Sequence, residues 1–351
     1  MGLSVTKGAT RQFRENDLNS FLECGAFAEW DDKHWLLFWG DCQEVADQPP
    51  RGVFISDFFR EKQAWLSFEH VALTSKKQWC QIASVRESKE SSRKWVKPAS
   101  DEFRGFFDSF KHWRQQGEVD KAVPVVFSTS SHALSISEKK QALSKLSQNS
   151  NDIIPYGFWN QEQGLLGGTP EVLFSGRDGS FSTMALAGTA RLAENHNLLN
   201  DDKELHEHKL VIEDISERLR NKKLVWSETR EWEVGNLKHL RTDARFEWQG
   251  NFVELVSLLH PTPALGLYPR SSNWQKLKRL CNPELRGFFG APFGIVFDQN
   301  WLCLVAIRNV QWNSDRTILG SGCGLVEEST LEKEWHELKA KREFTLGFLD
   351  I

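Results

Sequence analysis

The sequence predicts an α+β fold in which antiparallel strands dominate and helices cover them. Short apolar runs come in neighbouring pairs separated by turn residues, as in Ala26–Trp30 and His34–Trp39. Helical patterns stand between such runs instead of alternating with single strands, which disfavours a doubly wound parallel sheet. No sharp linker divides the 351 residues, so we expect a single domain over residues 1–351.

The first elements follow from local periodicity. Asp31-Asp32-Lys33 supplies the turn of the hairpin at 26–39, and Gly40 is expected to end its second strand. Asp101–Gln116 carries aromatic residues at helical spacing, which predicts a helix. Ala122–Phe127 is apolar and predicts a buried strand.

The middle of the chain combines strands with one clearly signalled helix. Gly164–Gly168 is expected to turn into a strand at Glu171–Phe174, with Ser180–Leu186 as its neighbour. A helix should begin after Asp201, because Asp201 can cap it and Glu204 follows three residues later.

The last third repeats this mixture. Helices are expected at Asn251–Leu259 and Ser272–Leu280, and paired strands at Phe293–Phe297 and Leu302–Ile307. Thr317–Leu319 then runs into the glycines at 320–324, and a final helix follows.

Composition excludes several functional classes. With 44 Lys and Arg against 48 Asp and Glu, the net charge is −4, so a non-specific nucleic-acid binder is not expected. Six cysteines are scattered without a CxxC motif, which fits reduced thiols in a cytoplasmic protein. No apolar run reaches membrane-spanning length, and the N-terminus lacks the hydrophobic core of a signal peptide.

The final helix carries the most informative polar row. Glu334, Glu337 and Lys341 project within about 60° of one another on a helix. Two carboxylates three residues apart repel unless a cation lies between them, and Mg2+ prefers oxygen ligands. The alternative is a solvated face with a single Glu337–Lys341 pair.

The segment His206-Glu207-His208 does not predict a zinc site. Helical residues two apart point about 200° away from each other, so His206 and His208 cannot hold one ion. His208 falls in the apolar arc, as a core histidine would. Glu207 borders that arc and either reaches a cleft or lies at a rim.

Other candidate residues lie at strand ends. The glycines at 320–324 lack the context of a dinucleotide site, but strand-end glycines let backbone N–H groups close on an anion. Arg308 suits a carboxylate or a structural ion pair equally. Lys121 is placed to act as a base or is simply solvated. Glu171 is either a general acid or a hydrogen-bonded structural group.

Ten segments then occur in a recognisable order. They are Lys121-Ala-Val-Pro-Val, Thr169-Pro-Glu-Val-Leu-Phe, Leu186-Ala-Gly-Thr-Ala-Arg191, Lys203-Glu-Leu-His-Glu-His208, Leu237-Lys-His-Leu240, His260-Pro-Thr-Pro-Ala-Leu-Gly266, Arg286-Gly-Phe-Phe-Gly290, Ala306-Ile-Arg308, Gly322-Cys-Gly-Leu-Val326 and Glu334-Trp-His-Glu337…Lys341. In this order they resemble the chorismate-utilising enzymes, which are the isochorismate, salicylate, anthranilate and aminodeoxychorismate synthases. The resemblance covers about residues 120–345 and leaves 1–115 more divergent. It implies large antiparallel sheets with helices packed outside around a central cleft.

The resemblance also implies a metal and a substrate. Glu207 and Glu337 would hold Mg2+, with Glu334 in support, and the ion would bind the ring carboxylate of chorismate. Arg308 would bind the enolpyruvyl carboxylate. The full set of substrate-binding residues that it implies is Gly188, Thr189, His239, Arg308, Gly322, Gly324 and Lys341.

The branch of the family follows from the chemistry. Lys121 matches the lysine that resembles the water-activating base of isochorismate and salicylate synthases, where ammonia-using relatives tend to carry glutamine. Glu171 matches the acid that would protonate the departing C4 hydroxyl. Ala187 stands where aminodeoxychorismate synthases place a nucleophilic lysine, and Ala190 resembles isochorismate synthases more than salicylate synthases. We therefore expect an isochorismate synthase, an isomerase of the hydroxymutase type.

Chorismate is the expected partner, with no membrane, no nucleic acid and no amidotransferase subunit, and the protein is expected to be a monomer. Alternatives are a salicylate synthase, a subunit that works with a glutaminase, and a chorismate-fold protein that binds without turnover. The pathway stays open between menaquinone and siderophore biosynthesis and salicylate-derived products. Two departures from the family pattern, Cys323 for a small alanine and Gly266-Leu267-Tyr268 for a glycine pair, would narrow the cleft or alter the fate of the pyruvyl group.

Overall fold

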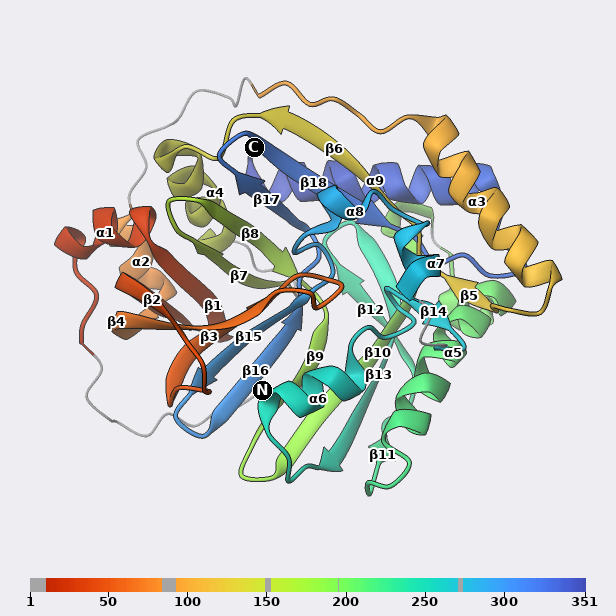
Figure 1. The fold of residues 1–351 in the computed structure, drawn as a ribbon, viewed down its shortest axis with the longest axis horizontal. Helices are drawn as coiled ribbons and strands as arrows, with labels where there is room; N and C mark the ends of the chain where they lie inside the picture. Colours follow the sequence, from red (N-terminus) through yellow and green to blue (C-terminus); the bar gives the residue numbers. More distant parts are fainter. Residues whose placement is uncertain (1–10, 84–92, 149–152, 195, 271–273) are drawn as a thin grey trace.

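The structure is a computed structural model that describes residues 11–83, 93–148, 153–194, 196–270 and 274–351. Sixteen of its strands form one continuous antiparallel sheet in the order β11-β13-β10-β9-β16-β15-β3-β4-β2-β1-β7-β8-β17-β18-β6, with β12 also paired to β13. A separate two-stranded sheet joins β14 to β5. The predicted α+β class with a large antiparallel sheet is therefore confirmed (Figure 1).

The strands have the following bounds: β1 Gly25–Asp31, β2 His34–Val45, β3 Arg51–Ser56, β4 Gln63–Ser75, β5 Lys121–Ala122, β6 Val125–Ser131, β7 Ile154–Trp159, β8 Gln163–Thr169, β9 Val172–Arg177, β10 Ser180–Arg191, β11 Val225–Trp226, β12 Arg230–Val234, β13 Leu237–Glu247, β14 Leu267–Tyr268, β15 Pro292–Phe297, β16 Asn300–Val305, β17 Asn309–Asn313 and β18 Arg316–Gly322. The α-helices are α1 Leu18–Glu23, α2 Lys76–Ile82, α3 Ser100–Gln115, α4 Ile136–Gln148, α5 Asp202–Arg218, α6 Phe252–Leu259, α7 Trp274–Lys278, α8 Pro283–Arg286 and α9 Leu331–Leu349. Short 3-10 turns lie at Glu15–Asp17, Leu192–Glu194 and Leu198–Asn200.

The predicted N-terminal hairpin is confirmed in β1 and β2, but the prediction that it ends at Gly40 is wrong. Instead, β2 continues to Val45 past a bulge that lies between Trp39 and Cys42. Gly40 has φ +93°, a conformation that glycine adopts without steric cost. The glycine therefore bends the strand instead of ending it.

The glycines at 164–168 lie within β8 and not in the predicted turn. A Cβ atom at Gly164 would lie 2.4 Å from the Trp312 ring, and one at Gly167 would lie 2.5 Å from Asn309. Both neighbours belong to β17, which pairs with β8. These glycines thus permit the close approach of two strands.

The predicted strand Ala122–Phe127 is split into β5 and β6. Pro124, which has no N–H to donate, lies in the break. The strand predicted at Thr317–Leu319 is longer than expected, because β18 continues through the first glycines to Gly322. The strands β15 and β16 pair as predicted.

The helices α3, α5 and α6 are confirmed. Asp201 caps α5 by accepting a hydrogen bond from the Glu204 N–H at 2.9 Å. The Glu204 side chain does not complete the expected capping box, because it accepts from the backbone N–H of Thr189 instead. The predicted helix Ser272–Leu280 is shorter, since α7 covers Trp274–Lys278; residues 271–273 lie outside the described residues.

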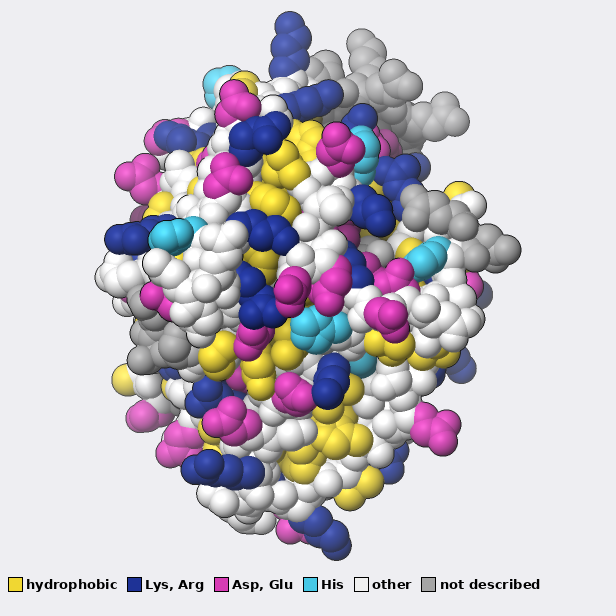
Figure 2. All heavy atoms as spheres, turned by 90° about the vertical axis from the view of Figure 1, so that its right-hand side faces the viewer, with side chains coloured by type: hydrophobic (Ala, Val, Ile, Leu, Met, Phe, Trp, Pro, Cys, Tyr) yellow, Lys and Arg dark blue, Asp and Glu magenta, His cyan; other side chains and the backbone are white. Residues whose placement is uncertain are grey.

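Helices lie around the sheet. Figure 1 shows α1, α2 and α4 grouped at one end of the molecule and α3, α5 and α7 towards the other. Helix α5 packs on β10, and α9 packs on β18, α3 and α4. The face seen in Figure 2 intersperses basic with acidic side chains. In the described part of the chain, no helix combines the length and apolarity needed to cross a membrane.

The N-terminal strands are an integral part of this sheet. β3 pairs with β15 on one side, and β1 pairs with β7 on the other. An apolar cluster between these strands includes Ala26, Phe38 and Phe293. A single domain over the whole chain stays a prediction, but residues 25–75 share the sheet that carries the site.

Candidate active site

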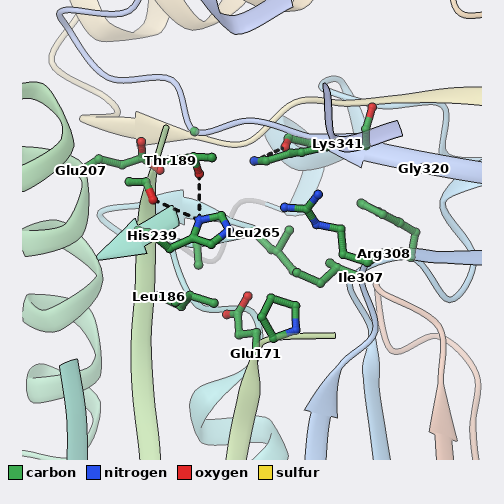
Figure 3. A pocket seen from close by; sticks show the side chains of 18 residues that line it. Glu171, Leu186, Thr189, Glu207, His239, Leu265, Ile307, Arg308, Gly320 and Lys341 are labelled. Atoms are coloured by element: carbon green, nitrogen blue, oxygen red, sulfur yellow. Dashed lines mark hydrogen bonds between the residues drawn. The ribbon is translucent and has the colours of Figure 1, made fainter. Parts of the chain in front are cut away.

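One cavity collects residues from most of the segments singled out in the sequence. The space between atoms in it, part of which is open to solvent, is about 630 Å3. It is lined by Glu171, Glu207 and the seven predicted substrate-binding residues, Gly188, Thr189, His239, Arg308, Gly322, Gly324 and Lys341. Lys121, Glu334 and Glu337 do not belong to its lining. In Figure 3, Glu207 and Lys341 face the cavity from the side opposite Glu171.

Glu207 projects into this cavity from α5. Its Oε1 lies 3.0 Å from Nζ of Lys121, which is fully buried. Burial would raise the pKa of Glu207, but the positive charges of Lys121 and Lys203 outweigh it and hold the pKa below its ordinary value. A Cβ atom at position 324 would lie 2.1 Å from Glu207 Oε1, so only a glycine leaves room for this carboxylate.

Glu337 is paired on the other helix, α9. Lys341 Nζ lies 2.5 Å from Glu337 Oε1 and donates to the backbone oxygen of Gly322 at 3.0 Å. Lys341 also lines the cavity, and its charge lowers the pKa of both Glu171 and Glu207. The Glu337–Lys341 pair that the sequence allowed is therefore present at a cavity wall and not on a fully solvated face.

Two further residues of this group were not predicted. Lys203 Nζ lies 3.0 Å from Glu204 Oε1 and 2.9 Å from Glu334 Oε1. Both carboxyl groups are buried, and burial together with neighbouring glutamates raises their pKa values. We refer to Lys121, Lys203, Lys341, Glu204, Glu207, Glu334 and Glu337 as the lysine–carboxylate cluster.

Lys121 lies in the short strand β5, which is paired with β14 and hydrogen-bonded to Leu325. In the β14–β5 pair, Tyr268 lies opposite Lys121 and Leu267 opposite Ala122. Ala122 also exchanges backbone hydrogen bonds with Leu325, just beyond the glycine loop. Gly266-Leu267-Tyr268 thus supports the strand of Lys121, while Ala264 and Leu265 form the cavity wall. The other departure, Cys323, is buried in the main core and does not line the cavity.

Glu171 lies at the entry to β9, as the sequence predicted, and is 4% exposed. Burial raises its pKa to about 7, although Lys121 and Lys341 pull in the opposite direction. Near neutral pH this carboxyl group therefore exists partly in its protonated form. A buried acid that holds a proton at neutrality is suited to protonate a leaving group.

Arg308 sits between β16 and β17 with a positive φ of +54°, an uncommon conformation for a residue with a side chain. Its Nη1 is buried and has no hydrogen-bond partner among the described residues. The guanidinium lies 5.4 Å above the Phe344 ring. Burial lowers the Arg308 pKa to about 10, so the group remains charged at neutral pH. A charged, incompletely bonded guanidinium in a cavity wall is suited to bind a carboxylate.

His239 is a neutral wall residue on β13. Its Nδ1 lies 3.0 Å from Thr189 Oγ1 and 3.1 Å from the Gly188 backbone oxygen. Burial and the charges of Arg308 and Lys341 lower the His239 pKa to about 3. His208 has a structural role, as predicted, with its Nε2 2.7 Å from Thr242 Oγ1.

Gly188 forms a bulge in β10 with φ +76°. The Thr189 N–H at this bulge donates to Glu204 Oε2 at 2.8 Å. The expectation that backbone N–H groups around Gly188 hold a substrate therefore needs a correction at Thr189, whose N–H is already bonded. The sequence signal for Glu204 was its position one helical turn before Glu207.

The metal prediction can be examined from the donors. Among the described residues, no three His, Cys, Asp or Glu side chains converge closely enough to hold an ion. Mg2+ is commonly held by one or two carboxylates together with water and substrate oxygens, so Glu207 and Glu337 fit this mode. Both Glu334 oxygens lack hydrogen-bond partners apart from the ion pair with Lys203.

Comparison with known proteins identifies the family and agrees with the fold. The sequence model of the family described as chorismate binding enzyme matches residues 56–349. The salicylate biosynthesis isochorismate synthase of Pseudomonas aeruginosa is 35% identical over 212 residues, which cover 53% of this chain and 43% of that protein. Isochorismate synthase MenF of Haemophilus influenzae is 26% identical over 369 residues, covering 95% of this chain and 80% of that protein.

A solved structure has the same fold. It is that of MenF, the menaquinone-specific isochorismate synthase from Escherichia coli, with a TM-score of 0.77, 19% identity and coverage of 95% of this chain and 91% of that chain. The family match and the fold together place the chain among the chorismate-binding α+β enzymes. The chain belongs to the chorismate binding enzyme family, and it matches less than half the length of the Pseudomonas relative.

Proposed function

We propose that the protein is an isochorismate synthase that converts chorismate to isochorismate with the help of Mg2+. The observation that carries the proposal is the arrangement of one cavity. A carboxyl group with a pKa of about 7, Glu171, faces the lysine–carboxylate cluster, and the incompletely bonded Arg308 lies in the same wall. This set supplies an acid and carboxylate-binding groups in the cavity wall, and Lys121, the proposed base, lies 3.0 Å from the lining residue Glu207.

The reaction is an isomerisation in which atoms balance without a further reactant. Water adds to C2 of the ring, the double bond moves, and the C4 hydroxyl leaves as water. Lys121 takes a proton from the attacking water, and Glu171 gives its proton to the departing hydroxyl. After turnover, a proton returns from the Lys121 ammonium to Glu171 through solvent.

Binding relies on the charged groups of the wall. Arg308 would fork onto the enolpyruvyl carboxylate, and Lys341 would support the ring carboxylate. Glu207 and Glu337 would hold Mg2+, which when bound would neutralise them in place of Lys121 and Lys341 and fix the ring carboxylate. Neutral His239 adds polarity without adding charge.

The test is to incubate the protein with chorismate and Mg2+ and to separate the products by chromatography. We expect isochorismate without pyruvate. Pyruvate release would indicate a salicylate synthase, and amination of chorismate with ammonia would indicate an ammonia-using relative. Thermal stabilisation by chorismate without any product would contradict catalysis altogether.

The base assignment is tested with Lys121→Met. We expect kcat to fall by roughly 100- to 10,000-fold, the range for loss of a positioned acid or base. Lys339→Met is the matched control, because Lys339 lies on the exposed side of α9. A Lys121→Met protein that still makes isochorismate at the native rate would refute the assignment.

A further inference from the structure

The lysine–carboxylate cluster has two tiers. Glu204 and Glu207 are one turn apart on α5, and Glu334 and Glu337 are one turn apart on α9. Glu207 and Glu337 form the inner tier and pair with different lysines, Lys121 and Lys341. Glu204 and Glu334 form the outer tier and share a single cation.

That shared cation is Lys203. Its Nζ spans the two helices, at 3.0 Å from Glu204 Oε1 and 2.9 Å from Glu334 Oε1. Each helix packs mainly on other elements, α5 on β10 and α9 on α4 and β18. The Lys203 bridge is therefore a direct side-chain link between the helices that carry the inner carboxylates.

The bridge continues to the cavity wall. The second oxygen of Glu204 accepts the N–H of Thr189 at 2.8 Å, next to the bulge at Gly188. The Glu204 side chain also packs against Gly188, where an added Cβ would lie 3.3 Å from Glu204 Cβ. Thr189 Oγ1 in turn contacts His239 Nδ1 at 3.0 Å. A chain of contacts thus runs from Lys203 to the wall that faces the substrate space.

We propose that Lys203 is a positioning residue that joins Glu204 to Glu334 and thereby sets both the placement of Glu207 and Glu337 for Mg2+ and the bulge at Gly188. The predicted change in KM rests on the proposed function. The predicted change in Mg2+ affinity does not depend on turnover. Lys203 does not line the cavity, so it acts through the two glutamates.

Charge alone predicts the opposite effect on the metal. Removing a cation from a group of four carboxylates would strengthen attraction for Mg2+. If Lys203 positions the carboxylates, its removal lets Glu204 and Glu334 repel each other, and the inner pair loses its placement. The direction of the change in affinity therefore separates the two roles.

The experiment measures the Mg2+ dissociation constant by calorimetry without substrate, and kcat and KM for chorismate at saturating Mg2+. For Lys203→Met we expect Mg2+ affinity to weaken about tenfold and KM to rise at least fivefold. Lys203→Arg, which can reach both carboxylates, should recover most of both values. The matched control is Lys209→Met on the same helix, because Lys209 is exposed and its Nζ lies 3.6 Å from Glu213 Oε1.

Mg2+ affinity that is unchanged or tighter in Lys203→Met overturns the proposal, as does a wild-type protein that binds no Mg2+. If Lys203→Met does not fold, Lys203→Arg and Glu204→Gln are measured instead. Lys203→Arg should keep near-native Mg2+ affinity, and Glu204→Gln should raise KM for chorismate. Native KM in Glu204→Gln would overturn the link to Gly188. If the wild-type protein makes no isochorismate, the proposed function is wrong. The Mg2+ dissociation constants still decide whether Lys203 positions the carboxylates.

Discussion

The lysine–carboxylate cluster reaches the cavity through Glu207 and Lys341, and Arg308 lines the same cavity, but the two are differently paired. In the cluster, each carboxylate already has a lysine partner within 3.0 Å. Arg308, by contrast, keeps a buried Nη1 without a hydrogen-bond partner among the described residues. The difference indicates that Arg308 is ready to receive an anion, whereas the cluster must exchange partners when ligands bind.

Between these two parts of the site, the largest effect is expected from the acid that lies opposite the cluster. Replacing Glu171 with Gln removes the transferable proton but keeps the size of the side chain. We expect kcat to fall by about 100-fold or more, with KM for chorismate changed by less than a few fold. Steady-state kinetics measures both, and an equal loss in kcat for Glu162→Gln, an exposed glutamate before β8, would show a nonspecific effect.

Arg308→Met tests whether the incompletely bonded guanidinium binds the substrate carboxylate. A charge-assisted hydrogen bond to a carboxylate contributes about 1.5–3 kcal/mol, so kcat/KM should fall by about 10- to 100-fold. Arg316→Met, at an exposed position of β18, is the control and should behave as the native protein. If both variants bind chorismate equally well, Arg308 is not the residue that donates hydrogen bonds to the substrate carboxylate.

The pH dependence sharpens the role of Glu171. Burial raises its pKa to about 7, so the protonated acid persists up to neutrality and is lost as the pH rises further. We expect kcat to decline above pH 7, approaching tenfold per pH unit. The rate is measured from pH 6 to 9 together with the thermal unfolding midpoint. A rate without any decline between pH 7 and 9 would contradict the assignment.

The smallest effect is expected at Gly324. Its replacement by Ala would place a methyl group against Glu207 Oε1 and disturb the contact with Lys121, so Mg2+ affinity should fall a few fold. Gly347→Ala is the control, because no atom lies within 4 Å of the added methyl group in α9. That control should raise stability by about 0.5–1 kcal/mol, since alanine favours helix. Calorimetry and thermal denaturation measure the two values.

Local signals predicted a good part of the fold. The cap at Asp201 marked α5, since its side chain accepts the N–H of Glu204, and apolar periodicity marked α6. The strand β13 was missed because buried polar residues interrupt its apolar pattern. His239 faces the cavity, whereas Lys238 pairs with Glu231 at 3.0 Å. A residue that serves the site and a residue in an ion pair thus conceal the strand.

The cavity itself could not be derived from periodicity. Its residues come from segments between 170 and 341, and only their order as family motifs brought them together. Lys203 shows the remaining limit. A lysine in the first turn of an acidic helix suggests a solvated side chain, and the contact with Glu334 depends on tertiary structure. Lys121 likewise looked solvated in isolation but is fully buried.

The position of β1–β4 inside the main sheet has a practical consequence for anyone who shortens this protein. A chain trimmed to residues 56–349, the part matched by the family model, would lack β1, β2 and nearly all of β3. β15 and β7 would then become bare edges with unpaired backbone groups. Bare edges recruit strands from other molecules, so the trimmed chain would precipitate although every cavity residue is retained.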